Sequence, residues 1–193
     1  MVRVWTQAGA LSWECVTTES VQKVAFSADG QRVVAVTTGK ELSIFESGSG
    51  HLVARLKHPN ELITADVAHT SNIVVTSAAD RVVRVWDMNG GLLAKLDHVK
   101  PVRSVCVSRD GMRVLTASED GCARLWDLNG NELFVFSDAA PLKQAVFSTD
   151  GQRVITTSAH CVRVWDFGSP GSIMARYGKT VGKFSDDTTS EGS

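Results

Sequence analysis

The sequence has little of what marks a reactive, membrane-bound or strongly charged protein. Its four cysteines show no Cys-x-x-Cys spacing and no clustering with histidine, which argues against a metal site or a disulfide framework. The formal net charge is −1, so no long-range field favours nucleic acid or an anionic membrane. Apolar runs are far shorter than the roughly 20 residues that a membrane-spanning helix needs. The composition favours a soluble intracellular protein.

Motifs of catalysis are also missing. No Gly-x-Ser-x-Gly elbow occurs, and the segment SGSG (47–50) joins two predicted strands instead of leading from a strand into a helix, so it does not predict a phosphate loop. His51, His69 and His160 are scattered and lie near no paired carboxylates. We therefore expect no catalytic, cofactor-binding or metal-binding residue, and no enzyme activity.

The cysteines indicate a compartment. Cys15, Cys106, Cys122 and Cys161 fall in predicted strands, where they are expected to act as small buried hydrophobic residues. Reduced thiols, together with a first segment that reads as a strand instead of a signal peptide, predict a cytoplasmic or nuclear protein.

What the chain does have is a repeat of about forty residues. Alignment on one aromatic position gives Trp5, Phe45, Trp86, Trp126 and Trp165, at spacings of 40, 41, 40 and 39. Three of the aromatic residues are followed by Asp, as in VRVWD (83–87) and ARLWD (123–127). A fixed period of this size indicates a repeat array.

Each repeat contains four short strand-like runs. In one repeat they are PVRSVCV (101–107), MRVLTAS (112–118), CARLW (122–126) and NELFVF (131–136), separated by turns rich in Asp, Asn and Gly. Asp-Gly supplies the positive φ that a tight hairpin needs. Four strands with tight turns form one antiparallel sheet, and such a small sheet must stack on its neighbours to bury both faces. The sequence therefore predicts an all-β array of stacked four-stranded sheets.

The period and the Trp-Asp dipeptide resemble the WD-repeat (Trp-Asp repeat) family of β-propellers, over residues 1 to about 187. The resemblance implies a hydrogen-bonded tetrad of His, Ser or Thr, Asp and Trp in each blade. One blade has the full set, His98, Ser118, Asp120 and Trp126. We interpret this set as structural, because its groups point at a Trp inside one sheet and not at a substrate.

The other blades depart from the tetrad. The blade ending at Trp86 has a partial tetrad, His58, Asp80 and Trp86, with Ala78 where Ser is expected and Ser77 one position away. In the blade ending at Trp165, Asp138 stands at the His position, so that indole is expected to lack these partners and its blade to be softer.

The strand count predicts incomplete blades at both ends. The expected segments are a partial blade at 1–16, full blades at about 21–56, 62–96, 101–136 and 141–177, the start of a further repeat at 181–187, and a disordered polar tail at 188–193. This count favours an arc of a larger propeller or a truncated product. A five-bladed ring closed by residues 181–184 is the second alternative. An arc leaves open blade faces, which favours self-association.

Function in such folds belongs to loops on a rigid scaffold. The loops that lead into each blade, together with the turns between its second and third strands, carry mixed charges at Lys57, Glu61, Arg81, Asp97, Lys100 and Glu119. This mixture favours protein or peptide partners over nucleic acid. The leading interpretation is a non-enzymatic scaffold or adaptor in a multiprotein complex; the alternatives are an RNA-associated adaptor or a fragment with no independent function.

Overall fold

The computed structural model describes residues 1–17 and 19–166, and the backbone of 176–183. All regular secondary-structure elements in this part of the chain are β-strands, as the all-β prediction requires. The first sheet has two strands, β1 (Val2–Trp5) and β2 (Leu11–Cys15). Four antiparallel sheets of four strands follow it in chain order.

Each four-stranded sheet is built from consecutive strands. The first holds β3 (Val21–Phe26), β4 (Arg32–Thr37), β5 (Glu41–Glu46) and β6 (Leu52–Lys57), and the second β7 (Leu62–Val67), β8 (Ile73–Ala78), β9 (Val82–Asp87) and β10 (Leu92–Asp97). The third holds β11 (Val102–Val107), β12 (Arg113–Ser118), β13 (Cys122–Asp127) and β14 (Glu132–Ser137), and the fourth β15 (Gln144–Phe147), β16 (Arg153–Thr157), β17 (Cys161–Asp166) and β18 (Arg176–Lys183).

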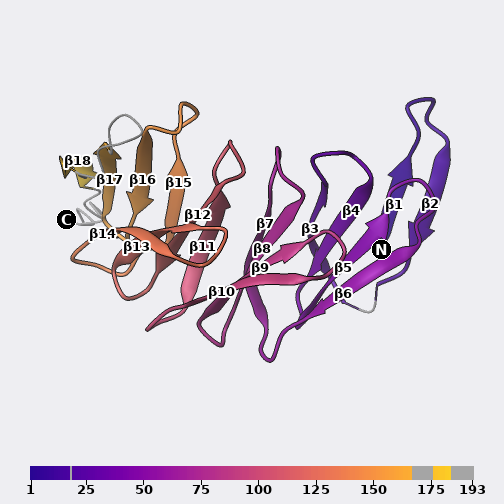
Figure 1. Ribbon diagram of the computed structural model, residues 1–193, viewed down its shortest axis with the longest axis horizontal. Coiled ribbons are helices and arrows are strands. Elements are labelled where there is room, and N and C mark those ends of the chain that lie inside the picture. Colours follow the sequence, from indigo (N-terminus) through magenta and orange to yellow (C-terminus); the bar gives the residue numbers. More distant parts are fainter. Residues whose placement is uncertain (18, 167–175, 184–193) are drawn as a thin grey trace, which may run out of the picture.

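The sheets stand next to one another in an open arc (Figure 1). The two-stranded sheet β1–β2 lies at one end of the arc and the sheet β15–β18 at the other, so these two sheets do not meet. One hydrophobic cluster fills each of the four seams between neighbouring sheets. The core is thus a series of thin layers, as expected for sheets that are stabilised by stacking.

The second strand of a sheet shows why these residues form a stack. In β8, Val74 packs toward the sheet β3–β6 and Val75 toward the sheet β11–β14, and neither side chain is exposed. Successive side chains of a strand point to opposite faces, so a strand buried on both faces must be apolar throughout. Burying each such valine contributes about 1.5–3 kcal/mol relative to leaving it exposed.

Polar contacts join the first strands of three successive sheets. The Asp66 carboxylate in β7 accepts a hydrogen bond from the Lys23 ammonium of β3 at 3.0 Å and from the Val107 amide of β11 at 3.0 Å. One acidic side chain therefore connects three sheets along the inner edge of the arc.

The end of the array differs from the expectation. Residues 181–183 belong to β18, which pairs with β17 in register with Val162↔Gly182, so they complete the fourth sheet and do not begin another repeat. The closure of a five-bladed ring through this segment is wrong, because its backbone partners lie in the fourth sheet and not in β1. Residues 184–187 and the tail 188–193 lie outside the described part of the chain.

Candidate functional site

The connections between sheets and the turns between second and third strands lie along one side of the arc, at the same end of the strands in each sheet, and we call this side the loop-and-turn end. It comprises residues 57–61, 78–81, 97–101, 118–121, 137–141 and 158–161. Backbone hydrogen bonds join its loops and turns: Ala79 donates to the Glu61 carbonyl at 2.9 Å, and Glu119 donates to the Pro101 carbonyl at 3.0 Å. The loops 57–61 and 97–101 are therefore each held against the turn of the sheet that they enter.

All six charged residues that the sequence singled out lie at this end. Lys57, Glu61, Asp97 and Lys100 are exposed, and within the described residues their side chains have no ion pair or hydrogen bond. These four side chains carry charges of both signs and are not paired with one another among the described residues.

The other two charged residues are fixed by contacts within the chain. Arg81 donates to the Val99 carbonyl at 3.2 Å from a backbone with φ of 67°. Glu119 forms an ion pair with Arg103, with 2.6 Å between Arg103 Nε and Glu119 Oε1. These two side chains therefore stabilise the conformation of the loops and turns. The sequence did not indicate this structural role.

A buried network supports this end in the third sheet. His98 Nδ1 donates to the Leu96 carbonyl at 2.9 Å, and His98 Nε2 lies 2.9 Å from Thr116 Oγ1. The Trp126 indole donates to the same hydroxyl at 3.1 Å. Burial lowers the pKa of His98 to about 4, so the ring is neutral near pH 7 and its Nε2 accepts the Thr116 proton.

The hydroxyl of this network is Thr116 and not Ser118, which corrects the predicted tetrad. Trp126 pairs with Val114, and its ring reaches Thr116, two residues along β12. Ser118 lies two residues further, about 6.6 Å away at the strand's rise per residue. It donates instead to the Lys100 carbonyl at 3.1 Å and so holds the loop that enters the sheet.

Asp120 stabilises the turn instead of touching the indole. Its carboxylate lies 2.8 Å from Arg124 and accepts the Cys122 amide hydrogen at 2.9 Å. Asp80 of the predicted partial tetrad does the same, because it pairs with Arg84 at 2.6 Å.

The second sheet repeats the network with a different hydroxyl from the one expected. His58 Nε2 lies 2.8 Å from Thr76 Oγ1, to which the Trp86 indole donates at 2.9 Å. Burial, and then the charge of Arg84, lower the pKa of His58. Ala78, which stands where Ser was expected, therefore removes no hydrogen bond from the network of this sheet.

The fourth sheet keeps the acceptor but not the histidine. The Trp165 indole donates to Thr156 at 2.9 Å, so it has a hydroxyl acceptor, although no histidine among the described residues stands beside that hydroxyl as one does in the second and third sheets. Asp138, at the histidine position, forms an ion pair with Arg163. The signal that the sequence offered was a Thr ten, ten and nine residues before Trp86, Trp126 and Trp165.

A histidine next to a threonine hydroxyl could suggest a nucleophile and its base. Thr76 and Thr116 are fully buried, however, and each oxygen already accepts an indole N–H. A nucleophile must reach its substrate and keep its base within hydrogen-bond reach. The arrangement therefore stabilises the sheet and has no access to a substrate.

The repeat visible in the structure is matched by a family model. The model described as WD domain, G-beta repeat (WD40) matches residues 50–87, 90–127 and 130–166, which is more than half of the chain. The chain belongs to the WD40 family. A comparison with curated proteins gave no match. WD40 repeats are generally non-enzymatic modules that mediate protein–protein interaction.

The matched WD40 repeats are offset from the sheets. The repeat at 50–87 begins with β6, the last strand of one sheet, and continues through β7, β8 and β9 of the next. Each repeat thus contributes to two neighbouring sheets and ties them together.

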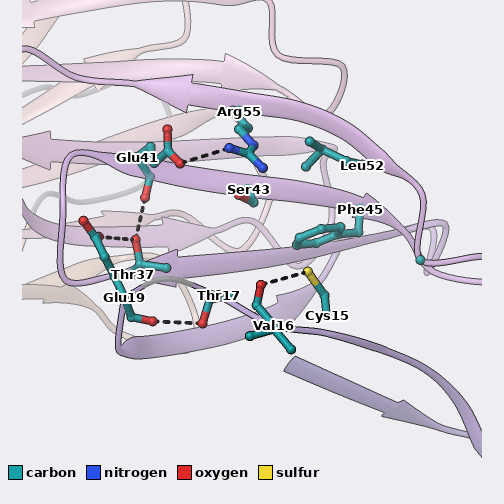
Figure 2. Close-up of a pocket in the computed structure, with 11 residues that line it drawn as sticks. Cys15, Val16, Thr17, Glu19, Thr37, Glu41, Ser43, Phe45, Leu52 and Arg55 are labelled. Atoms are coloured by element: carbon teal, nitrogen blue, oxygen red, sulfur yellow. Dashed lines mark hydrogen bonds and ion pairs between the residues drawn. The ribbon is translucent and has the colours of Figure 1, made fainter. Parts of the chain in front are cut away.

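A cavity of about 240 Å³ lies where the two-stranded sheet meets the first complete WD40 blade (Figure 2). Its charged groups contact the chain itself: Arg55 lies 3.6 Å from Glu41, and Thr37 Oγ1 lies 3.1 Å from Glu19 Oε2. The apolar part of its wall consists of Cys15, Val16, Phe45 and Leu52. The cavity thus shows no free charge of one sign that would select a ligand.

No group of three or more His, Cys, Asp or Glu side chains is placed to hold a metal ion among the described residues of this WD40 chain. The same part of the chain contains no helix long and apolar enough to cross a membrane.

Proposed function

We propose that this chain is a non-enzymatic scaffold that holds protein or peptide partners at its loop-and-turn end. The observation that carries the proposal is the set of exposed charges without partners, Lys57, Glu61, Asp97 and Lys100, on loops joined by backbone hydrogen bonds. Because these loops are already ordered, binding costs little additional conformational entropy. Four free cysteines suit a reducing compartment, so we place this role in the cytoplasm or nucleus.

The mixture of signs supports a protein partner over nucleic acid. Lys57 and Lys100 would attract phosphates, but Glu61 and Asp97 at the same end would repel them. Binding to a nucleic-acid backbone depends on the number of phosphates neutralised, and a balanced surface neutralises few. A protein surface with charges of both signs complements this end better.

Charge reversal tests the proposal. The variant Lys57→Glu/Lys100→Glu is expected to lose protein partners in affinity capture from cell lysate. Its melting temperature should stay close to that of the wild type, because exposed substitutions usually change stability by no more than about 0.5 kcal/mol.

The matched control is Lys95→Glu/Arg109→Glu, which changes the net charge equally at exposed positions away from this end. It should retain the same partners. Recovery of nucleic acid with a steep salt dependence, lost on nuclease treatment, would favour an RNA-associated adaptor instead. Equal losses in the variant and the control would contradict the proposal.

A further inference from the structure

Three large apolar side chains lie exposed beside the two-stranded sheet. Trp5 of β1 is 57% exposed, and Val24 and Phe26 of β3 are 54% and 56% exposed. Val24 and Phe26 share one face of β3, because alternate residues of a strand point the same way. The opposite face of β3 carries Ala25, which packs against the next sheet.

The same positions are buried in other sheets of this chain. Val24 and Phe26 correspond in the repeat to Ala65 and Val67 of β7, which are 7% and 3% exposed. Trp5 corresponds to Trp86 and Trp126, which are 9% and 7% exposed. The residue types therefore do not explain the exposure. Within the described residues, Val24 and Phe26 lack a strand packed against their face of β3, and Trp5 lies on the face of β1 that its counterparts Trp86 and Trp126 bury against a preceding sheet.

The second sheet shows what covers these positions. Val34 and Val36 of β4, a second strand, pack in the same cluster as Ala65 and Val67. Thr76 of β8, another second strand, accepts the hydrogen bond of the Trp86 indole in the same sheet.

The two-stranded sheet lacks the strands that would do this. By its place in the repeat, β1 is a third strand and β2 a fourth. Within the described residues, β1 pairs only with β2, so its other edge has no strand beside it. The Trp5 indole likewise has no acceptor in that part of the chain. Among the described residues, no first or second strand lies beside β1 in its sheet.

We propose that this surface, which we call the open-blade site, binds a β-hairpin of a partner protein. The site consists of Trp5, Val24, Phe26 and the free edge of β1. One strand of the hairpin pairs with β1 and offers a Ser or Thr hydroxyl to the Trp5 indole, and alternate apolar residues cover Val24 and Phe26. Addition of a strand to a free sheet edge is a general mode of peptide recognition. This interaction is separate from the one proposed at the loop-and-turn end.

The available room favours a hairpin over a second copy of the chain. Strands β1 and β2 already cover Phe45 and Val33 on this face of the first four-stranded sheet, so only the two inner positions are open. The other end of the arc presents a complete sheet of four strands, β15–β18, which could stack here only by displacing β1 and β2. Two antiparallel strands fill the space.

The chain itself supplies a probe. A synthetic peptide with the sequence of residues 144–157 contains a first and a second strand, an Asp-Gly turn and the threonine that accepts the Trp165 indole. Fluorescence anisotropy of the labelled peptide should show saturable binding to the full-length chain. The variant Val24→Ser/Phe26→Ser should weaken this binding about tenfold or more, because the apolar contact area is lost.

A double-mutant cycle tests the hydrogen bond at Trp5. A peptide with Thr156→Val should bind the wild-type chain about three- to tenfold more weakly, and the loss should disappear when the chain carries Trp5→Phe. A purely apolar attraction would give no such coupling and would overturn the assignment of the paired strand.

The control variant is Met112→Ser, at a turn position that is 66% exposed and distant from the site, which should leave peptide binding unchanged. Failure of the peptide to bind the wild-type chain would overturn the proposal. Self-association on sedimentation, abolished by Val24→Ser/Phe26→Ser, would instead assign the site to a second copy. The loop-and-turn variant Lys57→Glu/Lys100→Glu should bind the peptide normally, so this test and that of the proposed function can fail separately.

Discussion

Thr116 is the residue on which the third sheet's polar core depends. Its hydroxyl joins His98 of the connection between sheets to Trp126 of the third strand, and the side chain is fully buried. A buried hydroxyl that satisfies two partners is costly to remove, because both are left without a partner. The equivalent Thr156 has only the Trp165 indole as a side-chain partner among the described residues.

Replacement of Thr116 by Val should therefore destabilise the chain by about 1–3 kcal/mol, because the isosteric side chain keeps the volume and removes both hydrogen bonds. Thr156→Val should cost less, since one bond is lost. Urea denaturation of the two variants measures the difference. Equal losses would show that the His98 contact contributes nothing.

The neutral state of His98 predicts a pH dependence. Burial lowers its pKa to about 4, whereas an unfolded histidine titrates near 6.5, so the unfolded chain binds more protons between these values. Stability from this group is fully present above about pH 6.5 and falls by about 3 kcal/mol as the pH drops to about 4.

Replacement of His98 by Asn should reduce the slope of stability against pH in that window, while the contribution of His58, whose pKa burial also lowers, remains. Melting curves recorded between pH 4 and pH 7, in steps of about half a unit, give the comparison. The aspartates with lowered pKa, such as Asp110, lose their contribution only below the ordinary carboxylate pKa. A slope unchanged by His98→Asn would assign the pH dependence to other groups.

At the scale of the element, the Asp-Gly turns between first and second strands behave differently from sheet to sheet. Gly30 and Gly111 have nearly the same backbone, with φ of 69° and 70°. A Cβ on Gly30 would meet nothing within 4 Å, whereas one on Gly111 would lie 2.5 Å from Ser71 Oγ and 2.7 Å from Ser71 Cβ. The same turn is thus free in one sheet and packed against its neighbour in another.

Alanine substitution should separate these two situations. Gly30→Ala is expected to cost about 1–2 kcal/mol, the penalty of a left-handed backbone for a residue with a side chain. Gly111→Ala should cost a further 1–3 kcal/mol or so, because the Ser71 side chain and its hydrogen bond to the Gly111 carbonyl must move. Chemical denaturation of both variants checks the order; equal values would mean that the turns do not press on each other.

Much of this element structure could be predicted from the sequence, because strand length, alternation and Asp-Gly turns are local signals. The strand β4 and its turn at Asp29 follow from the residues themselves. The last strand, β18, does not follow from the sequence, because its residues 181–183 resemble the end of a first strand and only their pairing with β17 decides their place.

The site shows the same division. The connectivity of antiparallel strands determines that the charged loops share one end, so Lys57 and Lys100 could be placed from the sequence. The network hydroxyl could not, because it depends on how far an indole reaches across the sheet, which made Ser118 look as suitable as Thr116. The open face of β3 at Val24 could not be recognised from the sequence, because it shows only when the exposed fraction of Val24 is compared with that of the equivalent residues in other sheets.

For the whole molecule, the arc makes stability depend on position. The second and third sheets are covered on both faces by their neighbours, whereas β1 and β2 share a single seam in which few residues are fully buried. In a stacked array each unit gains stability from its neighbours, so the ends open first.

Hydrogen exchange should follow this order. Amides in β8 and β12 are expected to exchange slowest, and those in β1 and β2 fastest, by two orders of magnitude or about 3 kcal/mol of opening free energy. Mass spectrometry of peptic fragments resolves these strands. Uniform protection from β1 to β17 would mean that the array opens as one cooperative unit.

The offset between the repeats and the sheets has a genetic consequence. The turns Asp87-Met88-Asn89-Gly90 and Asp127-Leu128-Asn129-Gly130 have nearly the same sequence and each joins a third strand to a fourth. Recombination between them would delete residues 88–127 and connect β9 to β14 through an intact Asp-x-Asn-Gly turn. The shortened gene would still encode whole sheets, because β14 would take the place of β10. An array built in this way can gain or lose a unit without a single broken blade.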